Sequence, residues 1–256
     1  MYKRQLLAQA FDLLTQTGAR LDLDALVRFI DSADPALVAA VGRLETRHFR
    51  DVVSDLETLR LSGSKLFEAA PERLDVASMF SPGREGRTRL TIISTQFFGD
   101  SSATLFWVAQ LLLAVNRWTS KHPAPRLAGC LLLDEADLFL PAAAQPATKA
   151  PLESLLKRAR ETGLGVLLAT QSPGDLDFKS RDSIGSWFVG RLKEPAALAK
   201  LKPVLAGATA ERIAAQKPRE FVLLRDGVAT ELRAASSCVA PEERPEAEIL
   251  RLARRR

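Results

Sequence analysis

The chain has 256 residues, of which 46% are hydrophobic and 26% are charged, as in ordinary globular proteins with one large domain or two small ones. Two cysteines exclude a disulfide scaffold, and the absence of any run of 18 apolar residues excludes a transmembrane span, so a cytoplasmic protein without a membrane partner is expected. The formal net charge of +5 permits a nucleic-acid partner without arguing strongly for one.

The first 80 residues are predicted to be helical throughout. Apolar residues recur at helical spacing in four segments, and the third segment begins at Asp34-Pro35, a typical helix start. The residues expected to face inward are Leu6, Leu7, Ala10, Phe11 and Leu14, then Leu23, Leu26, Val27 and Ile30, then Leu37, Val38 and Val41, and finally Val52, Val53, Leu56 and Leu59. Residues 1–80 therefore read as a small helical bundle or insertion.

After a turn-rich passage, residues 81–87, the pattern changes to alternating strands and helices. Strands are expected over 89–95, 130–133, 164–171 and 186–192, with helices over 101–118 and 152–163 between them. Residues 220–234 read as a hairpin that turns at Asp226-Gly227. This order predicts an α/β fold with a mostly parallel sheet, flanked by helices and with the hairpin at its late edge.

The stretch CLLLDEADLF, residues 130–139, carries the strongest chemical signal. An apolar strand, in which Cys130 is expected to be a small core residue, runs directly into Asp134 and Glu135. Acids at the carboxyl end of a strand lie where open α/β folds bind their ligands. The phosphate-cradling pattern G-x-x-x-x-G-K-S/T is nevertheless absent, because none of the 14 glycines precedes a lysine.

Three segments taken in order resemble the C-terminal portion of a HerA/FtsK-type P-loop ATPase. They are LLLDEADLFLP, LLKRARETGLGVLLATQSPGDLD and GSWFVGRLKEPAALAKL. The resemblance covers residues 87–235 and implies a RecA-like P-loop NTPase core without its Walker A segment. It makes residues 1–80 a helical insertion, leaves 236–256 as a basic C-terminal helix or tail, and places the phosphate loop upstream of Met1.

The same resemblance assigns roles at the strand ends. Asp134 would bind Mg²⁺, and Glu135 would polarise the water that attacks ATP. Gln171 would be the polar sensor that touches the terminal phosphate or the water, with Thr170 as its weaker companion. From the residues alone, the two acids could merely begin a solvated loop, Gln171 could cap a turn, and Asp137 is expected to be a loop or cap residue.

Arginines supply the other implied site residues. Ring ATPases present an arginine at the position of Arg160 to the nucleotide of the adjacent subunit, where its charge stabilises the transition state. Arg158 is the second choice for this finger, and Arg191, after a strand, could be a further arginine on the phosphate side. The alternative is that Arg158 and Arg160 lie on the solvated face of an amphipathic helix.

The resemblance thus implies part of an ATP-dependent DNA translocase or helicase-like motor. In its complete form such a motor would be a homo-oligomeric ring, a hexamer, acting on DNA with ATP and Mg²⁺, with a nuclease or another ATPase as a possible partner. The alternative is a non-catalytic, degenerate ATPase-like subunit that supports a competent ATPase. The missing phosphate loop leaves this chain alone without expected activity.

Overall fold

The computed structural model describes residues 2–18, 21–42, 46–62, 74–83, 85–95, 101–171, 173–205, 210–237 and 242–253. The chain divides into two compact units. The helical unit comprises Met1–Asp75 with Ile92–Thr104, and the α/β unit comprises Val76–Thr91 with Leu105–Arg256. Within the described residues, no helix is long and apolar enough to cross a membrane.

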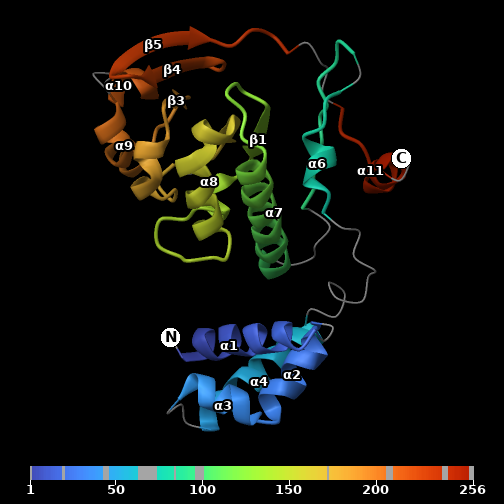
Figure 1. Cartoon of the computed structure of the whole chain (residues 1–256). Helices are drawn as coiled ribbons and strands as arrows, with labels where there is room; N and C mark the ends of the chain where they lie inside the picture. The colour runs from blue at the N-terminus through green and yellow to red at the C-terminus, as the bar shows by residue number, and fades with distance from the viewer. Residues whose placement is uncertain are drawn as a thin grey trace. The chain divides into compact units, whose positions relative to one another are not determined.

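The helical unit contains the four predicted helices, drawn in blue in Figure 1: α1 (Tyr2–Gln16), α2 (Leu23–Asp31), α3 (Pro35–Val41) and α4 (Thr46–Ser62). The side chains of Asp22 and Asp34 cap α2 and α3, each accepting a backbone N–H over 2.8 Å. One apolar core joins all four helices (Leu6, Ala10, Leu14, Leu26, Val27, Ile30, Leu37, Val41, Phe49, Val52 and Leu56). This core gives the unit its own hydrophobic stabilisation.

Three side chains predicted to face this core are exposed instead: Phe11, Val38 and Leu59. In α1 the stripe through Leu6 and Ala10 is fully buried, whereas Phe11 lies one residue, or about 100° of helical rotation, beyond Ala10. The spacing of apolar residues in the sequence fits both this stripe and the adjacent one that contains Phe11, so it could not show which of them faces the core. The prediction was therefore right for the helices and wrong for part of their inward faces.

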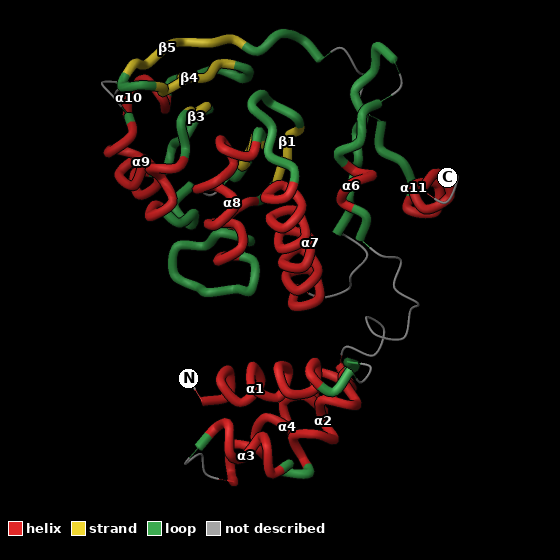
Figure 2. The backbone as a smooth tube through the Cα atoms, viewed as in Figure 1, coloured by secondary structure: helices red, strands yellow, loops and turns green. Residues whose placement is uncertain are grey.

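The α/β class predicted from the sequence is confirmed in the second unit. Strand β1 (Gly129–Leu133) pairs in parallel with β2 (Leu164–Leu168), and helix α8 (Lys149–Thr162) connects them and packs against β2 (Figure 2). Helix α7 (Ser101–Lys121) precedes β1. The amide of Asn116 on α7 donates to the carbonyl of Pro151 on α8 over 2.8 Å, which fixes the two helices together.

A glycine sets the passage from α8 to β2. Gly163 ends the helix with φ of +70°, a left-handed conformation that favours glycine. A Cβ at this position would lie 2.5 Å from the carbonyl oxygen of Arg126 and 2.7 Å from that of Ala124. Glycine is therefore needed at this position because φ is positive and because a side chain would clash with the segment that precedes β1.

One face of the β1–β2 sheet is open. Leu132 and Leu167 are register partners, and their side chains are 62% and 50% exposed. Cys130, two residues before Leu132 and so on the same face, is also exposed, whereas Leu133 and Leu164 are buried. The prediction that Cys130 lies in the core was wrong, because helices α7 and α8 leave this second face without cover by described residues.

The remaining strands form an antiparallel sheet of their own, in the order β3–β4–β5. These strands are β3 (Ser186–Val189), β4 (Glu220–Arg225) and β5 (Val228–Arg233), and the predicted turn at Asp226-Gly227 joins the last two with both residues at positive φ. Helices α9 (Pro195–Leu201) and α10 (Ala210–Ala214) pack on this sheet around a second core (Val189, Leu198, Leu201, Leu205, Ile213, Val222 and Leu224). The hairpin therefore pairs with β3 and does not extend the parallel sheet.

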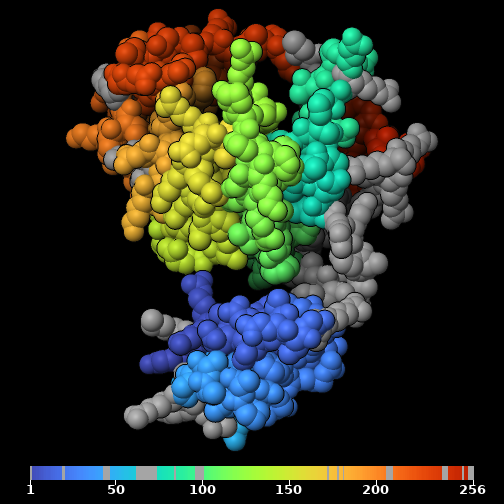
Figure 3. All heavy atoms as spheres, in the orientation of Figure 1, coloured from blue at the N-terminus to red at the C-terminus, as the bar shows by residue number. Residues whose placement is uncertain are grey.

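Shorter elements complete the unit: α6 (Val76–Met79), the 3-10 turns η2 (Ala136–Leu138), η3 (Phe178–Ser183) and η4 (Lys202–Val204), and α11 (Glu246–Ala253). In Figure 3 the blue-green region of the chain, which contains α6, lies beside the green region, which contains α7. There Phe80 stacks on Trp118 with ring centroids 5.1 Å apart and also covers Gly129 at the start of β1. These contacts tie residues 76–83 to the start of the parallel sheet.

Residues 89–95, predicted as a strand, do not form one. Leu90 and Ile92 are 80% and 81% exposed, and no described strand pairs with this segment. β-branched residues favour a pleated, half-buried surface, so their preference takes effect only where a neighbouring strand and a core are present. The strand prediction at 89–95 was therefore wrong.

Candidate functional site

The predicted strand-end residues meet at one edge of the parallel sheet. Because β1 and β2 run in the same direction, with Leu133 opposite Leu168, Asp134 and Glu135 leave the sheet beside Thr170. Backbone hydrogen bonds continue past the strands: Ala169 N–H donates to Leu133 over 2.9 Å, and Ala136 N–H donates to Ala169 over 2.8 Å. The two outgoing segments are thus held side by side.

Glu135 has an unusual backbone. Its φ of 49° and ψ of 48° place it in the left-handed region, which costs a non-glycine residue about 1–2 kcal/mol. The carboxylate of Asp134 accepts the N–H of Glu135 over 3.0 Å, and both side chains are exposed at the sheet edge. The turn therefore exposes two neighbouring carboxylates at a conformational cost, and strained residues of this kind gather at functional sites.

A hydrogen bond that the sequence did not predict links the two strand ends. The Thr170 hydroxyl donates to a carboxylate oxygen of Asp137 over 2.5 Å. Asp137 was expected to be a loop or cap residue, whereas it positions the residue directly before Gln171. Gln171 itself is exposed at the same edge. An acid four residues after β1 thus pairs with a hydroxyl two residues after β2. This pairing follows from the parallel register, which the spacing of residues in the sequence did not give.

The two arginines of α8 differ in their surroundings. Arg158 Nη2 donates to Asn116 Oδ1 over 3.3 Å, and Asn116 is itself buried and bonded to α7 and α8 backbone. Arg158 is thus tied to the contact between the two helices. Arg160 is exposed in the last turn of α8, where a basic side chain also complements the helix dipole. Both arginines are exposed to solvent, and they differ in that Arg158 also bonds to Asn116 on α7.

Arg191 is placed apart from the other candidates. It follows β3, which belongs to the antiparallel sheet, and its side chain is exposed. The remaining site residues all belong to β1, β2, α8 and the segments that follow the two strands. The structure therefore brings Asp134, Glu135, Thr170 and Gln171 to one edge and leaves Arg191 on a separate sheet.

The carboxylate of Asp134 fits a magnesium ion only as one ligand among several. Among the described residues, no cluster of three or more His, Cys, Asp or Glu side chains could hold a metal ion. Mg²⁺ commonly takes one or two protein carboxylates and completes its shell with waters and substrate phosphates. One Asp134 oxygen accepts the Glu135 N–H, so the other is the suitable ligand for such a shared ion.

A buried ion pair close to this edge was also missed from the sequence. Lys149 Nζ lies 2.8 Å from Asp177 Oδ2, and the two side chains are only 5% and 4% exposed. Burial alone would raise the pKa of Asp177, but the Lys149 ammonium and the N–H of Lys179 hold it below its ordinary value of 3.8. No short motif marks such a pair, because its partners lie 28 positions apart in sequence.

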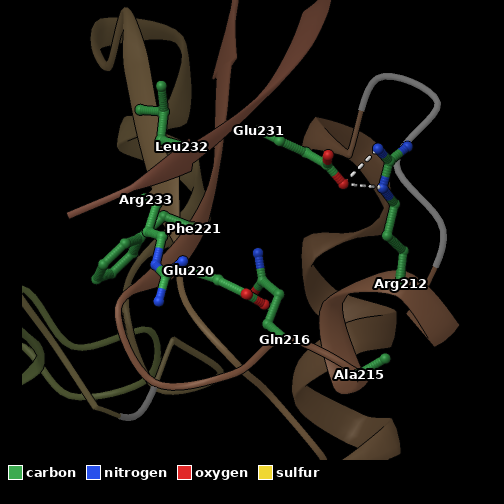
Figure 4. Close-up of a pocket in the computed structure, with 8 residues that line it drawn as sticks. All are labelled: Arg212, Ala215, Gln216, Glu220, Phe221, Glu231, Leu232 and Arg233. Carbon is green, nitrogen blue, oxygen red and sulfur yellow. Dashed lines mark hydrogen bonds and ion pairs between the residues drawn. The ribbon is translucent and has the colours of Figure 1, made fainter.

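A pocket of about 470 Å³ lies elsewhere, between α10 and the hairpin (Figure 4). It is lined by Arg212, Ala215, Gln216, Glu220, Phe221, Glu231, Leu232 and Arg233, so none of the predicted site residues contributes to it. Arg212 Nε donates to Glu231 Oε1 over 2.6 Å across its mouth. The predicted site is thus an exposed sheet edge and not this cavity.

Comparison with known proteins gives likeness only at the level of the fold. No family model matches the sequence, and no curated protein matches it. The chain is similar to solved structures of the genome packaging NTPase B204 from Sulfolobus turreted icosahedral virus 2. With the ATP-gammaS complex it shares 16% identity and a TM-score of 0.45, over 63% of this chain and 77% of that one. With the AMPPCP complex the identity is 19% and the TM-score 0.42, over 52% and 62%. At these values the likeness carries no residue roles.

Proposed function

We propose that this chain supplies the hydrolysis side of a nucleotide site in an ATP-driven DNA translocase of the HerA/FtsK type. The observation that supports it best is the sheet edge, where Asp134 and Glu135 after β1 lie beside Thr170 after β2. Phosphoryl transfer requires mainly positioned charge, and this edge holds two exposed carboxylates and a primary amide. The left-handed backbone of Glu135 supports the proposal further, because strained residues cluster at functional sites.

Each side chain has a defined part in this proposal. The Glu135 carboxylate accepts a proton from the attacking water, and the Gln171 amide orients that water by donating to it or accepting from it. Asp134 would hold Mg²⁺ together with the nucleotide phosphates, where the ion would neutralise charge on the phosphate oxygens. The formal net charge of +5 is compatible with a DNA partner, whose phosphates attract basic surfaces without sequence choice.

The phosphates need a cradle that these 256 residues do not encode as G-x-x-x-x-G-K-S/T. We propose that it comes from another segment or another chain. The second candidate function is a non-catalytic ATPase-like subunit that offers Arg160 to the nucleotide of a competent neighbour. The observation in its favour is that Arg160 is exposed while the neighbouring Arg158 is engaged with Asn116.

Nucleotide titration tests the need for a cradle. Backbone N–H groups and the lysine of a phosphate loop supply most of the contacts to the phosphates. The chain alone should therefore bind Mg-ATP weakly, with Glu135→Gln unchanged in affinity because that substitution keeps the shape of the edge. Micromolar affinity in calorimetry would contradict this account and require a phosphate site of a different kind.

Subunit mixing in the assembly that contains the cradle tests whether Arg160 acts on the nucleotide of a neighbouring subunit. If Arg160 acts across a subunit boundary, Arg160→Ala and Glu135→Gln should each lose most turnover, and a mixture should regain part of it. The gain arises because one interface in the mixture pairs an intact Glu135 with an intact Arg160. Arg158→Ala is the matched control. If the mixture recovers no turnover, Arg160 acts within its own subunit or is only a surface residue of the helix.

A further inference from the structure

The segments that leave β1 and β2 stay joined well beyond the strands. Close to the sheet, Thr170 donates to Asp137 as described above. Further along, Asp177 N–H donates to Leu140 over 2.9 Å and Ala142 N–H donates to Asp175 over 2.8 Å. Gln171 lies between these two sets of links. These links bracket Gln171 in the sequence, at residue 170 on one side and residue 175 on the other.

The second set of links is organised around one ammonium group. Lys149, at the start of α8, donates to the carbonyl of Pro141 over 2.8 Å and forms the buried ion pair with Asp177. The other Asp177 oxygen accepts the N–H of Lys179 over 2.8 Å. The pair thus holds together α8, the segment that follows Asp134 and Glu135, and the segment that follows Gln171.

Stability alone is a poor reason for this arrangement. A buried ion pair commonly contributes no more than a well-packed apolar pair of similar volume, because removing two charges from water offsets their attraction. Its distinguishing property is that each buried charge needs the other, since removing one partner leaves an uncompensated charge, so the two segments that carry them must stay together. Thr148, fully buried beside Lys149, adds a further fixed contact through its hydroxyl to the carbonyl of Phe139, 2.8 Å away.

We propose that Lys149 and Asp177 are positioning residues that set the orientation of Gln171 at the Asp134–Glu135 edge. The role assigned to Gln171 rests on the proposed function. The positional claim itself concerns only this chain without nucleotide. Replacing the pair by apolar side chains should leave the fold intact and release the Gln171 amide from its orientation.

The test compares K149M/D177L with the unaltered chain by NMR at neutral pH, without nucleotide. The readouts are the side-chain NH₂ signals of Gln171, assigned by their loss in Gln171→Glu, and the backbone amide of Thr170. We expect both to shift or broaden in the double variant while circular dichroism and the melting temperature stay close to the original. The control is Asn116→Leu, which loosens α8 at a different contact and should leave these signals in place.

Several results would overturn the proposal. The signals could stay unchanged in a folded K149M/D177L chain, or Asn116→Leu could move them equally. If K149M/D177L does not fold, the uncharged pair K149Q/D177N takes the same measurement. If neither variant folds, the ion pair is required for folding as a whole and has no specific role in positioning Gln171. Because no nucleotide is present, none of these results depends on whether the chain takes part in ATP hydrolysis.

Discussion

The hydroxyl of Thr170 lies 2.5 Å from the carboxylate of Asp137, and this contact joins the residues that follow the two parallel strands. It connects the segment that presents Glu135 to the segment that presents Gln171. A carboxylate that accepts a hydroxyl in a partly buried place forms a stronger bond than two neutral groups. The geometry of the candidate site therefore depends on a residue pair that contains neither proposed catalytic side chain.

Thr170→Val tests the strength of this contact. Valine keeps the shape of threonine but cannot donate, so the free energy of unfolding should fall by about 1–2 kcal/mol. All three tryptophans, Trp107, Trp118 and Trp187, belong to the α/β unit, so their fluorescence during urea unfolding reports on that unit. Thr162→Val, whose hydroxyl bonds to carbonyls of its own helix, should change stability less. Equal effects would show that the Asp137 contact adds nothing specific.

Gly163→Ala tests the turn that delivers β2 to its place beside β1. A positive φ costs alanine about 1–2 kcal/mol, and the clash with the Arg126 and Ala124 carbonyls adds roughly 1–3 kcal/mol. Gly227→Ala is the matched control, because φ there is +76° and a Cβ would meet nothing within 4 Å. The melting temperature should therefore fall much further for Gly163→Ala. Similar losses in the two variants would contradict the steric part of this explanation.

The pKa of Asp177 predicts a dependence of stability on pH. A carboxyl group whose pKa is lower in the folded state stabilises the fold above its unfolded pKa, and this contribution is lost as pH falls through the folded value. Since Asp177 titrates below 3.8 in the fold, its contribution should be complete at pH 5 and should decline below about pH 4. Urea unfolding at pH 5 and pH 3 should show a smaller loss in K149M/D177L than in the original chain. An equal loss of stability in the two chains would show that other carboxylates cause the acid sensitivity.

The open face of the parallel sheet predicts self-association. Leu132→Thr with Leu167→Thr should reduce dye binding and aggregation and should leave the melting temperature nearly unchanged, because both side chains already lie in water. The control Leu164→Thr removes a buried side chain and should cost about 2–4 kcal/mol. Light scattering that is unaffected by the double change would show that this face does not drive association.

The sequence predicted most elements of this fold and failed where contacts between distant residues decide the structure. The hairpin at Asp226-Gly227 was predictable because its turn is local. The lack of a strand at 89–95 was not predictable, since that outcome depends on a partner strand elsewhere. Cys130 shows the same limit: the apolar run indicated a strand, but only the packing of α7 and α8 decides which of its faces is buried.

For the candidate site, the sequence predicted the position of residues that are adjacent in the chain, but it did not predict contacts between residues far apart in the chain. Asp134 and Glu135 follow an apolar strand directly, so their place at a sheet edge was readable. The contacts of Asp137 with Thr170 and of Lys149 with Asp177 span 33 and 28 positions. The first follows from the parallel register and the second from the packing of α8 on the segment after β2, and neither is recorded by a pattern in the sequence.

Binding of Mn²⁺-ATP, followed through NMR line broadening in the 256-residue chain, tests whether a nucleotide site lies at the Asp134–Glu135 edge. Mn²⁺ takes the same oxygen ligands as Mg²⁺ and broadens signals of nearby amides. At high concentrations of Mn²⁺-ATP, broadening should begin at Asp134, Glu135, Ala136 and Gln171 and should be lost in Asp134→Asn, while free Mn²⁺ without ATP should give a weaker pattern. Broadening centred on other residues, or unchanged in Asp134→Asn, would contradict the assignment of a nucleotide site to this edge.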